Sequence, residues 1–350
     1  MQTGTHSHER RVLTLASSLI LVGCSTSAQP TNKSMPNLEK SNIMSQENSP
    51  KKPVCLGRYV IDLPANSVVR ASFKFARRAI DTKLNTTSSD FERMISTREL
   101  ELKKARHQKV DNTFIAKTEL AQNKILIQSI DSPVSTAVHK NEIFIFSSEN
   151  KILYKLTGTG DAESQLDSVA SARRIAELFK YRGTDEIPSG IGFCINNGLI
   201  ASKSLNREEV SASIDFKKYP TISFSISSLV TGNPTEGLIS RTDRALANEP
   251  AALLAAMTIL RKGKRNVGPL QAEEILIRTT EDGKRAYAFS WKSEGKADSI
   301  EFPAIAIKLT TSDKTDTSGA VADAPFKTDK EALEFWDELL GTLRLRPGAV

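Results

Sequence analysis

A cysteine near the amino terminus lies in a pattern that is typical of lipid attachment. The run Leu21-Val22-Gly23-Cys24 ends an apolar stretch, 12–22, which follows the basic opening at 6–11. Diacylglycerol transfer needs an accessible thiol, and cleavage before that cysteine needs a small preceding residue such as Gly23. The stretch is shorter than the ~20 residues of a membrane-spanning helix, and its basic flank is typical of a cleaved signal. We therefore predict a signal peptide over 1–23 and lipidation of Cys24; the alternative is a chance cysteine after an ordinary signal.

The residue after Cys24 indicates where the mature protein works. A residue other than aspartate at this position, here Ser25, directs bacterial lipoproteins to the outer membrane. We therefore expect a periplasmic protein that acyl chains hold at the outer membrane. Cys55 and Cys194 would then lie in an oxidising compartment, where disulfides form and persist. We predict that they are bonded to each other; two separate buried thiols remain the alternative, because sequence does not place two sulfur atoms within bonding distance.

No motif in the rest of the chain supports catalysis. The sequence contains no Gly-x-Ser-x-Gly, His-Glu-x-x-His, Cys-x-x-Cys or Walker pattern. Beyond the signal peptide the only histidines are His107 and His139, and neither lies in a pattern of ligands or partners. Gly158-Thr-Gly160 matches a phosphate loop in two glycines alone. We therefore expect no enzymatic activity, no metal and no cofactor.

The basic composition directs attention to acidic partners. The net charge is +7 and the pI about 9.2. For a periplasmic protein an acidic protein or anionic lipid is a more plausible partner than nucleic acid. The densest basic run is Arg261, Lys262, Lys264 and Arg265, which we interpret as a loop after a helix, either simply solvated or in contact with a partner. The loops considered for partner binding are Thr231–Glu236, Arg261–Asn266 and Asp313–Thr328.

The elements that would carry these residues fall into two similar halves. Residues 24–53 are rich in Ser, Asn, Pro, Gln and Lys, which predicts a disordered tether with a reach of about 30 Å. The rest is longer than one hydrophobic core usually spans, so we predict domains over 54–185 and 190–350, joined where Gly, Pro and Ser gather in 182–190. Each half begins near a cysteine and continues with strands, a helix, more strands and a closing helix. The predicted fold is α+β, with two similar domains, each an antiparallel sheet packed with helices, and a possible internal duplication.

Hydrophobic periodicity and capping signals place the elements of the first half. Ser89 and Glu92 form a capping-box signature for a helix with apolar residues at helical spacing. Apolar runs separated by polar turns predict strands over 125–130, 143–146 and 152–156. A closing helix is predicted from Leu166 to Phe179.

The second half opens with two alternating strands, 210–216 and 222–226, which predict a hairpin. A helical region is predicted over 237–260, with Pro250 in the first turn of a new helix. Strands are predicted over 274–278 and 287–291, around an Asp282-Gly283 turn, and over 304–309. The signature Thr328 to Glu331 predicts a last helix, and 343–345 a terminal strand.

Three segments resemble one protein family. They are Cys55-Leu-Gly-Arg-Tyr-Val-Ile-Asp-Leu-Pro64, Gly192-Phe-Cys-Ile-Asn-Asn-Gly198, and Trp336-Asp-Glu-Leu-Leu340 with Leu343-Arg-Leu-Arg-Pro-Gly348. With the lipid-attachment signal, this chain resembles the periplasmic immunity lipoproteins that neutralise lipase effectors of the type VI secretion system, most closely those directed at the fourth class of these phospholipases.

The resemblance implies a two-domain α+β protein that grips the effector between its lobes and obstructs lipase opening or substrate entry. The function that we predict is stoichiometric inhibition of a cognate phospholipase. The first alternative is a non-enzymatic outer-membrane lipoprotein of lipid carriage or envelope assembly, which should contain a contiguous apolar cavity. A degenerate enzyme is a further alternative.

Overall fold

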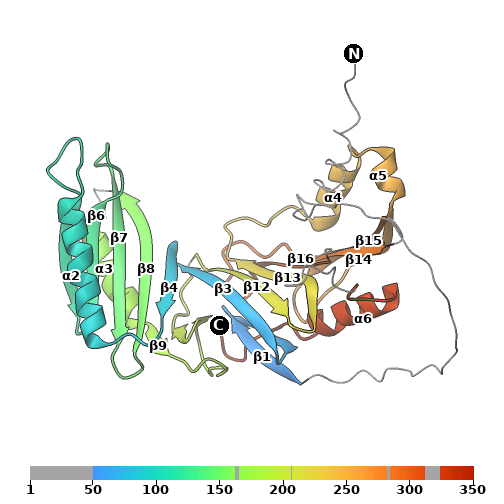
Figure 1. Ribbon diagram of the computed structural model, residues 1–350, viewed down its shortest axis with the longest axis horizontal. Helices are drawn as coiled ribbons and strands as arrows, with labels where there is room; N and C mark the ends of the chain where they lie inside the picture. Colours follow the sequence, from blue (N-terminus) through green and yellow to red (C-terminus); the bar gives the residue numbers. More distant parts are fainter. Residues whose placement is uncertain (1–49, 162–164, 206, 282–283, 312–323) are drawn as a thin grey trace, which may run out of the picture.

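The computed structural model describes residues 50–161, 165–205, 207–281, 284–311 and 324–350. The predicted signal peptide, Cys24, most of the tether and the Asp282-Gly283 turn lie outside these ranges. The described part of the chain forms two lobes (Figure 1). None of its helices combines the length and apolar character that a membrane crossing needs.

The first half contributes strands and two long helices. In chain order they are β1 (Lys51–Leu56), β2 (Tyr59–Pro64), β3 (Ser67–Phe75), β4 (Arg78–Lys83), α2 (Ser88–Lys104), β5 (Phe114–Ala121), β6 (Lys124–Ile130), β7 (Val138–Ser147), β8 (Ile152–Asp161), α3 (Gln165–Glu177) and β9 (Phe179–Tyr181). The strands predicted over 125–130, 143–146 and 152–156 are confirmed. β1 begins at Lys51, so the last three residues of the predicted tether belong to a strand instead.

The second half repeats this order. Its elements are β10 (Phe193–Ile195), β11 (Gly198–Ile200), β12 (Glu209–Phe216), β13 (Tyr219–Leu229), α4 (Leu238–Leu246), α5 (Ala251–Ala255), β14 (Met257–Lys264), β15 (Ala272–Glu281), β16 (Lys284–Ser293), β17 (Ala304–Thr311), α6 (Asp329–Leu340) and β18 (Arg344–Leu345). The hairpin of β12 and β13 and the strands over 274–278, 287–291 and 304–309 are confirmed.

One antiparallel sheet of 12 strands runs through both lobes, in the order β14-β15-β16-β17-β13-β12-β3-β4-β8-β7-β6-β5. Its centre is the pairing of β3 with β12, where Ala71 lies opposite Ala212. On one side of this centre the order is β3, β4, β8, β7, β6 and β5, and on the other it is β12, β13, β17, β16, β15 and β14. Strands at the same place along the two halves of the chain thus lie at the same distance from the centre. The prediction of a separate sheet in each domain is therefore wrong. Strand pairing between the halves is a non-local contact that hydrophobic periodicity does not encode.

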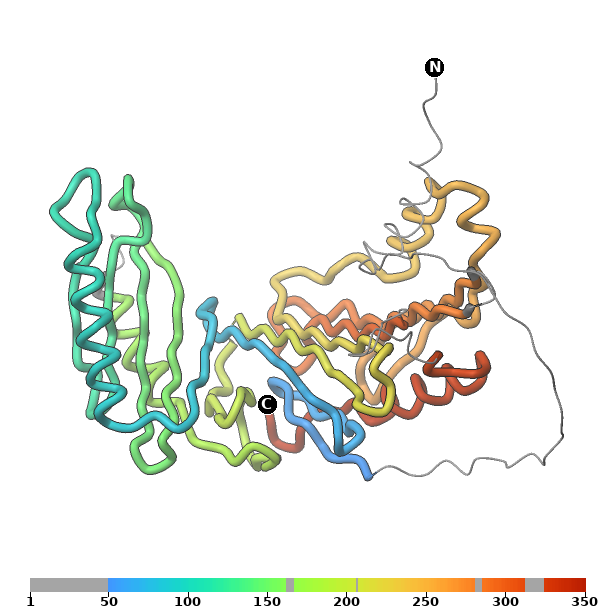
Figure 2. The backbone as a smooth tube through the Cα atoms, in the orientation of Figure 1, coloured from blue at the N-terminus to red at the C-terminus, as the bar shows by residue number. Residues whose placement is uncertain are grey.

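Two small sheets interlace the halves further. The β1-β2 hairpin is completed by β18, from the end of the second half, and the β10-β11 hairpin by β9, from the end of the first. The chain leaves the two closing strands in matching ways, because Arg346 N–H donates to the Arg58 carbonyl at 2.9 Å and Arg182 N–H donates to the Asn197 carbonyl at 3.1 Å. Figure 2 shows the C-terminus beside the blue β1-β2 hairpin, where β18 pairs with β2.

Helices cover both faces of the sheet in each lobe. In the first lobe, Phe91 and Ile95 of α2 pack on Phe144 and Phe146, while α3 packs on the opposite face. In the second lobe, α4 packs through Leu238 on β15, and α6 packs on the opposite face, in the main core. The strands between the lobes, β3, β12 and β13, contribute no residue to the helix-packing clusters of α2 and α4.

Helix ends differ from the sequence predictions in two places. The capping box of α2 is Thr87 with Asp90, two residues before the predicted pair, because Thr87 is the residue with extended backbone. Thr328 caps α6 as predicted, accepting from Glu331 N–H at 3.1 Å. The closing helix of the first half ends at Glu177, and Phe179 lies in β9.

The helical region predicted over 237–260 also differs. Pro250 does precede a helix, but α5 ends at Ala255 and the chain continues as β14 from Met257. Pairing of β14 with β15 satisfies the backbone there, and this tertiary contact overrides the local apolar pattern.

Candidate partner-binding face

The central strands are buried on one side and open on the other. In β12, Val210, Ala212 and Ile214 are buried, while Ser211 and Ser213 between them are exposed. β13 alternates in the same way, with small hydroxyl residues on its open side. Because side chains alternate across a strand, the serine-interrupted pattern in the sequence marks one uncovered sheet face.

We call this surface the serine face and define it by the outward residues of four neighbouring strands. They are Val68, Arg70, Ser72 and Lys74 of β3; Glu209, Ser211, Ser213 and Asp215 of β12; Ser223, Ser225, Ser227 and Leu229 of β13; and Ala306, Lys308 and Thr310 of β17.

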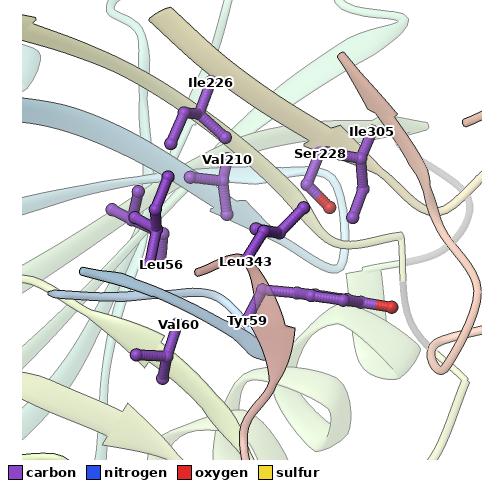
Figure 3. Close-up of a pocket in the computed structure, with 9 residues that line it drawn as sticks. Leu56, Tyr59, Val60, Val210, Ile226, Ser228, Ile305 and Leu343 are labelled. Carbon is purple, nitrogen blue, oxygen red and sulfur yellow. The ribbon is translucent and has the colours of Figure 1, made fainter. Parts of the chain in front are cut away.

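The opposite side of the same strands is closed by the β1-β2-β18 sheet. Leu56, Tyr59 and Leu343 meet Val210 and Ile305 there around an apolar pocket (Figure 3). Its volume is about 10 Å³, which is about the size that one water molecule requires. The pocket is therefore a packing seam and is far too small for an acyl chain.

Two ion pairs neutralise the β3 side of the serine face. Arg70 pairs with Asp215, and Lys74 Nζ lies 3.0 Å from a Glu209 carboxylate oxygen. Both pairs are exposed, so each contributes at most about 1 kcal/mol to stability. Their effect is to leave this side of the face without a net charge.

The β17 side is different, because Lys308 is cationic and unpaired. Its cross-strand neighbours are Ser225 and Ser290, and in the described part of the chain no carboxylate lies within ion-pair distance of it. Burial lowers the pKa of Lys308, and the nearby Arg241 of α4 lowers it further. Two cations thus lie together at this end of the serine face.

Acidic groups gather around the neighbouring Lys292 instead. Its Nζ donates to the Glu236 carbonyl at 2.7 Å. Burial and Arg241 lower the pKa of Lys292, while Glu294, Glu236 and Glu273 oppose that shift. The acids that compensate Lys292 do not compensate Lys308.

The predicted basic loop is mostly a strand, and its arginines are used within the fold. Residues 261–264 belong to β14, and only Arg265 and Asn266 follow it as loop. Arg261 Nε lies 2.5 Å from the buried Glu274 carboxylate, and Arg265 Nη1 lies 2.7 Å from Asp337. The interpretation of this run as a loop is wrong because strand pairing with β15 brings these arginines beside the acids.

The two lysines of that run remain on the surface. Lys262 Nζ lies 2.5 Å from Asp243 of α4. Lys264 is exposed, and no ion pair of it is found within the described ranges. Of the four candidate contact residues, Lys264 is therefore the best placed to meet a partner.

A second polar group lies beside α2, around the buried Glu142 carboxylate. Arg98 Nε and Lys155 Nζ approach its two oxygens at 2.7 and 2.5 Å. Burial alone raises the pKa of Glu142, but the hydrogen bonds from Lys155 and Arg98 outweigh it and hold the pKa below its usual value. The hollow there has a volume of about 290 Å³. Glu142 lies on the same side of the sheet as the serine face. Strand pairing shows this, because Glu142 lies opposite Thr157, Thr157 opposite Ala79, and Ala79 opposite Lys74 of the serine face.

The segments that carry the family resemblance meet at the junction of the halves. Cys55 and Cys194 form a disulfide with a Cα–Cα distance of 6.0 Å. The buried Arg58 donates to Glu208 at 2.7 and 2.8 Å and to the Ala349 carbonyl.

Arg346 ties the C-terminal segment to the start of the second half. It is fully buried and donates to the carbonyls of Pro188, Gly190 and Gly192 at 2.6 to 2.8 Å. Gly192 and Gly348 have positive φ values, 146° and 69°, in the region that favours glycine. These landmark residues therefore hold the halves together.

Family profiles match both halves of the chain. The profile described as "Tle cognate immunity protein 4 N-terminal domain" matches residues 52–157, and that of the "C-terminal domain" matches residues 186–348. The chain belongs to the Tle cognate immunity protein 4 family. No sequence among the curated proteins matches it.

Solved structures of the same family share this fold. The apo immunity protein TplEi of the type VI secretion system of Pseudomonas aeruginosa is 28% identical, with a TM-score of 0.79 over 87% of this chain and 100% of that one. A chain of the Tle4-Tli4 complex is 29% identical, with a TM-score of 0.79 over 85% of this chain and 98% of that one. TplEi has also been solved with an "L" peptide, and that structure matches with a TM-score of 0.73, 28% identity and coverage of 85% and 98%.

Of the other two loops predicted to contact a partner, the structure describes one completely and one in part. Thr231–Glu236 is a loop, as predicted, between β13 and α4. Of Asp313–Thr328, residues 313–323 lie outside the described ranges, and 324–328 lead into α6 as a loop.

Sequence reasoning missed Lys308 and Arg241. The signal for Lys308 was a lysine in the otherwise apolar run of the strand predicted over 304–309. Its environment was not readable from the sequence, because it depends on α4 packing on β15 and bringing Arg241 near Lys308.

Proposed function

We propose that this protein binds its cognate type VI phospholipase effector one to one and blocks it by occlusion, without hydrolysing phospholipid itself. The observation that carries the proposal is the match of both halves to the Tle cognate immunity protein 4 family, together with the likeness to a chain solved in the Tle4-Tli4 complex. The alternative of a lipid carrier is disfavoured by the apolar pocket, whose volume of about 10 Å³ excludes an acyl chain.

The size of the serine face supports binding by both lobes. Three strand spacings of about 4.8 Å and six residues at about 3.4 Å give a face of roughly 300 Å². A stable protein complex buries about 800 Å² on each partner. The serine face alone is too small, so flanking surfaces of both lobes must contribute, as expected for a protein that grips its partner.

The experiment is an inhibition titration. The mature chain carrying Cys24→Ser, residues 24–350, is added to the cognate phospholipase effector, and phospholipid hydrolysis is followed. We expect activity to fall to zero at one equivalent, with calorimetry giving the same stoichiometry. Full lipase activity with excess protein, and no complex, would reject the proposal.

We further propose that the protein acts at the periplasmic side of the outer membrane, tethered through Cys24. Residues 24–50 precede β1 and would let the folded lobes stand about 30 Å from the membrane. Confinement at the surface where the effector meets its substrate raises the local concentration of the inhibitor.

We also propose that the two halves arose by duplication of one unit. Each half has a hairpin with a cysteine, a second hairpin, helical cover, four strands, a closing helix and a short strand. The equivalent strands occupy equivalent positions in the 12-stranded sheet. The exchange of β9 and β18 between the hairpins follows from this approximate two-fold relation.

A further inference from the structure

One row of residues crosses the middle of the serine face, and the positive charge near one end of this row has no acidic partner among the described residues. Across five adjacent strands the register places Arg70, Ser213, Ser225, Lys308 and Ser290 side by side. Arg70 is neutralised by Asp215. Lys308 lies three strand spacings, or about 14 Å, away, and no ion pair neutralises it within the described ranges.

The cover of the sheet changes immediately beyond Lys308. Ser290, its neighbour, lies opposite Ile275 of β15, and Ile275 is buried beneath Leu238 of α4. α4 therefore forms a step beside the open face, and Arg241, one turn after Leu238, is exposed at that step. Lys308 lies where the open face, with its small hydroxyl side chains, meets the side of α4. We call this place the corner.

The charged groups around Lys308 come from α4 and from the neighbouring strand β16. α4 contributes Arg241, and β16 contributes Lys292. The acids Glu236, Glu273 and Glu294 lie around Lys292, and Glu236 is further engaged by Arg244 at 2.6 Å. Lys308 has no such partner in the described residues. A half-buried cation beside a second cation is unfavourable in the free protein, and an anion that enters the corner relieves both costs.

We propose that an acidic side chain of the effector binds between Lys308 and Arg241, with its carboxylate hydrogen-bonded by the neighbouring serine hydroxyls. The inference rests on the proposed function, and it specifies the partner's chemistry: a carboxylate that projects from the effector onto the serine face. A protein carboxylate suits the corner better than a lipid headgroup, because β1, which joins the predicted membrane tether, packs on the opposite side of this sheet. The small serine side chains allow a partner's backbone to approach closely and lose little conformational entropy on binding.

The test uses the mature chain with Cys24→Ser and the cognate phospholipase effector. Lys308→Met and Arg241→Gln are each expected to weaken binding about 10- to 100-fold, the range for a lost hydrogen bond to a charged group. The matched control is Lys217→Met, which removes an exposed lysine from the β12–β13 turn and should leave affinity unchanged. Because Lys308 and Arg241 would bind the same carboxylate, their effects should not be additive in a double-mutant cycle.

Thermal unfolding separates a binding role from a structural one. Lys308→Met removes a half-buried positive charge that no acid among the described residues balances. The melting temperature of this variant should therefore equal or exceed that of the wild type, while its affinity for the effector falls. Lys308→Arg, which keeps the charge, should retain most of the affinity. Should Lys308→Met unfold, Arg241→Gln gives the same binding readout from an exposed helix position.

The outcomes are distinct. Wild-type inhibition together with unchanged binding by Lys308→Met and Arg241→Gln would overturn this inference and leave the proposed function standing. Failure of the wild type to inhibit would reject the proposed function itself. Sedimentation with phosphatidylglycerol vesicles that depends on Lys308, with effector binding unaffected, would identify the corner as a lipid headgroup site and would equally overturn the inference.

Discussion

The sulfur atoms of Cys55 and Cys194 are bonded although the two residues are 139 positions apart in the chain. Cys55 is the next-to-last residue of β1 in the first half, and Cys194 lies in β10 of the second. Gly57 and Cys194 are also joined by a pair of backbone hydrogen bonds, of 2.7 and 3.1 Å. The disulfide therefore fastens the two cysteine-bearing hairpins to each other.

We expect removal of this disulfide to lower the free energy of unfolding substantially. Cross-linking a loop of this length stabilises by about 4–5 kcal/mol in the chain-entropy model. The measurement is urea unfolding of the Cys55→Ala/Cys194→Ala variant beside the wild type, with and without dithiothreitol. Dithiothreitol should destabilise only the wild type. Equal stability of all four samples would show that the cross-link contributes nothing.

Stability should fall in acid in a way that depends on Glu142. Its pKa is held below the usual 4.5 in the folded state. The folded protein therefore prefers the ionised form, and this stabilisation is complete above the unfolded pKa and is lost as pH falls through the folded one. Glu142→Gln should cost about 1–3 kcal/mol at pH 7, and the deficit should shrink below pH ~4.5. A deficit that is constant with pH would contradict this explanation.

Substitutions in the basic run should separate fold from partner binding. Arg261→Glu places a second negative charge beside the buried Glu274 carboxylate, which should cost about 3–5 kcal/mol. Lys264→Glu changes the same net charge at an exposed position and should alter stability by less than about 0.5 kcal/mol. Urea unfolding checks both. If Lys264 contacts the effector, its reversal should mainly slow association, as stopped-flow measurements at low salt can determine.

Separating the halves should abolish independent folding. Fragments 50–185 and 186–350 would each expose the strand edge that pairs β3 with β12, and each would lose the strand that completes its hairpin sheet. We expect either fragment alone to aggregate, and the two expressed together to form a complex cross-linked through Cys55 and Cys194. Nonreducing electrophoresis detects that cross-link. Cooperative melting of one fragment alone would refute the prediction.

The lipid anchor is tested by Cys24→Ser. If Cys24 carries the acyl chains, the variant should move from the outer-membrane fraction to the soluble periplasm and protect cells less well from the effector. Fractionation with immunoblotting provides the measurement, and Ser25→Ala, which leaves Cys24 in place, serves as the control. Membrane recovery of Cys24→Ser at the wild-type level would exclude lipidation at this residue.

Most elements could be predicted because their information is local. Alternation of serines with apolar residues in 210–216 and 222–226 specifies strands with one buried side, and helical spacing after Thr328 specifies α6. The disulfide was predictable because only two thiols remain after Cys24. Local patterns were insufficient at Met257–Leu260, where an apolar run suits a helix or a strand equally, and pairing with β15 decided the outcome.

What the sequence alone determined was thus the order of strands and helices, the cysteine pair, the lack of a catalytic motif and the family resemblance. Only the tertiary structure decided which strands pair across the halves and what each charge contacts. Arg261 contacts Asp337, 76 residues away, and becomes part of the fold. Lys308 lies near Arg241 instead, and no acid among the described residues pairs with it. The physical reason is that a charge takes its energy from neighbours within a few ångströms, and those neighbours come from distant parts of the chain.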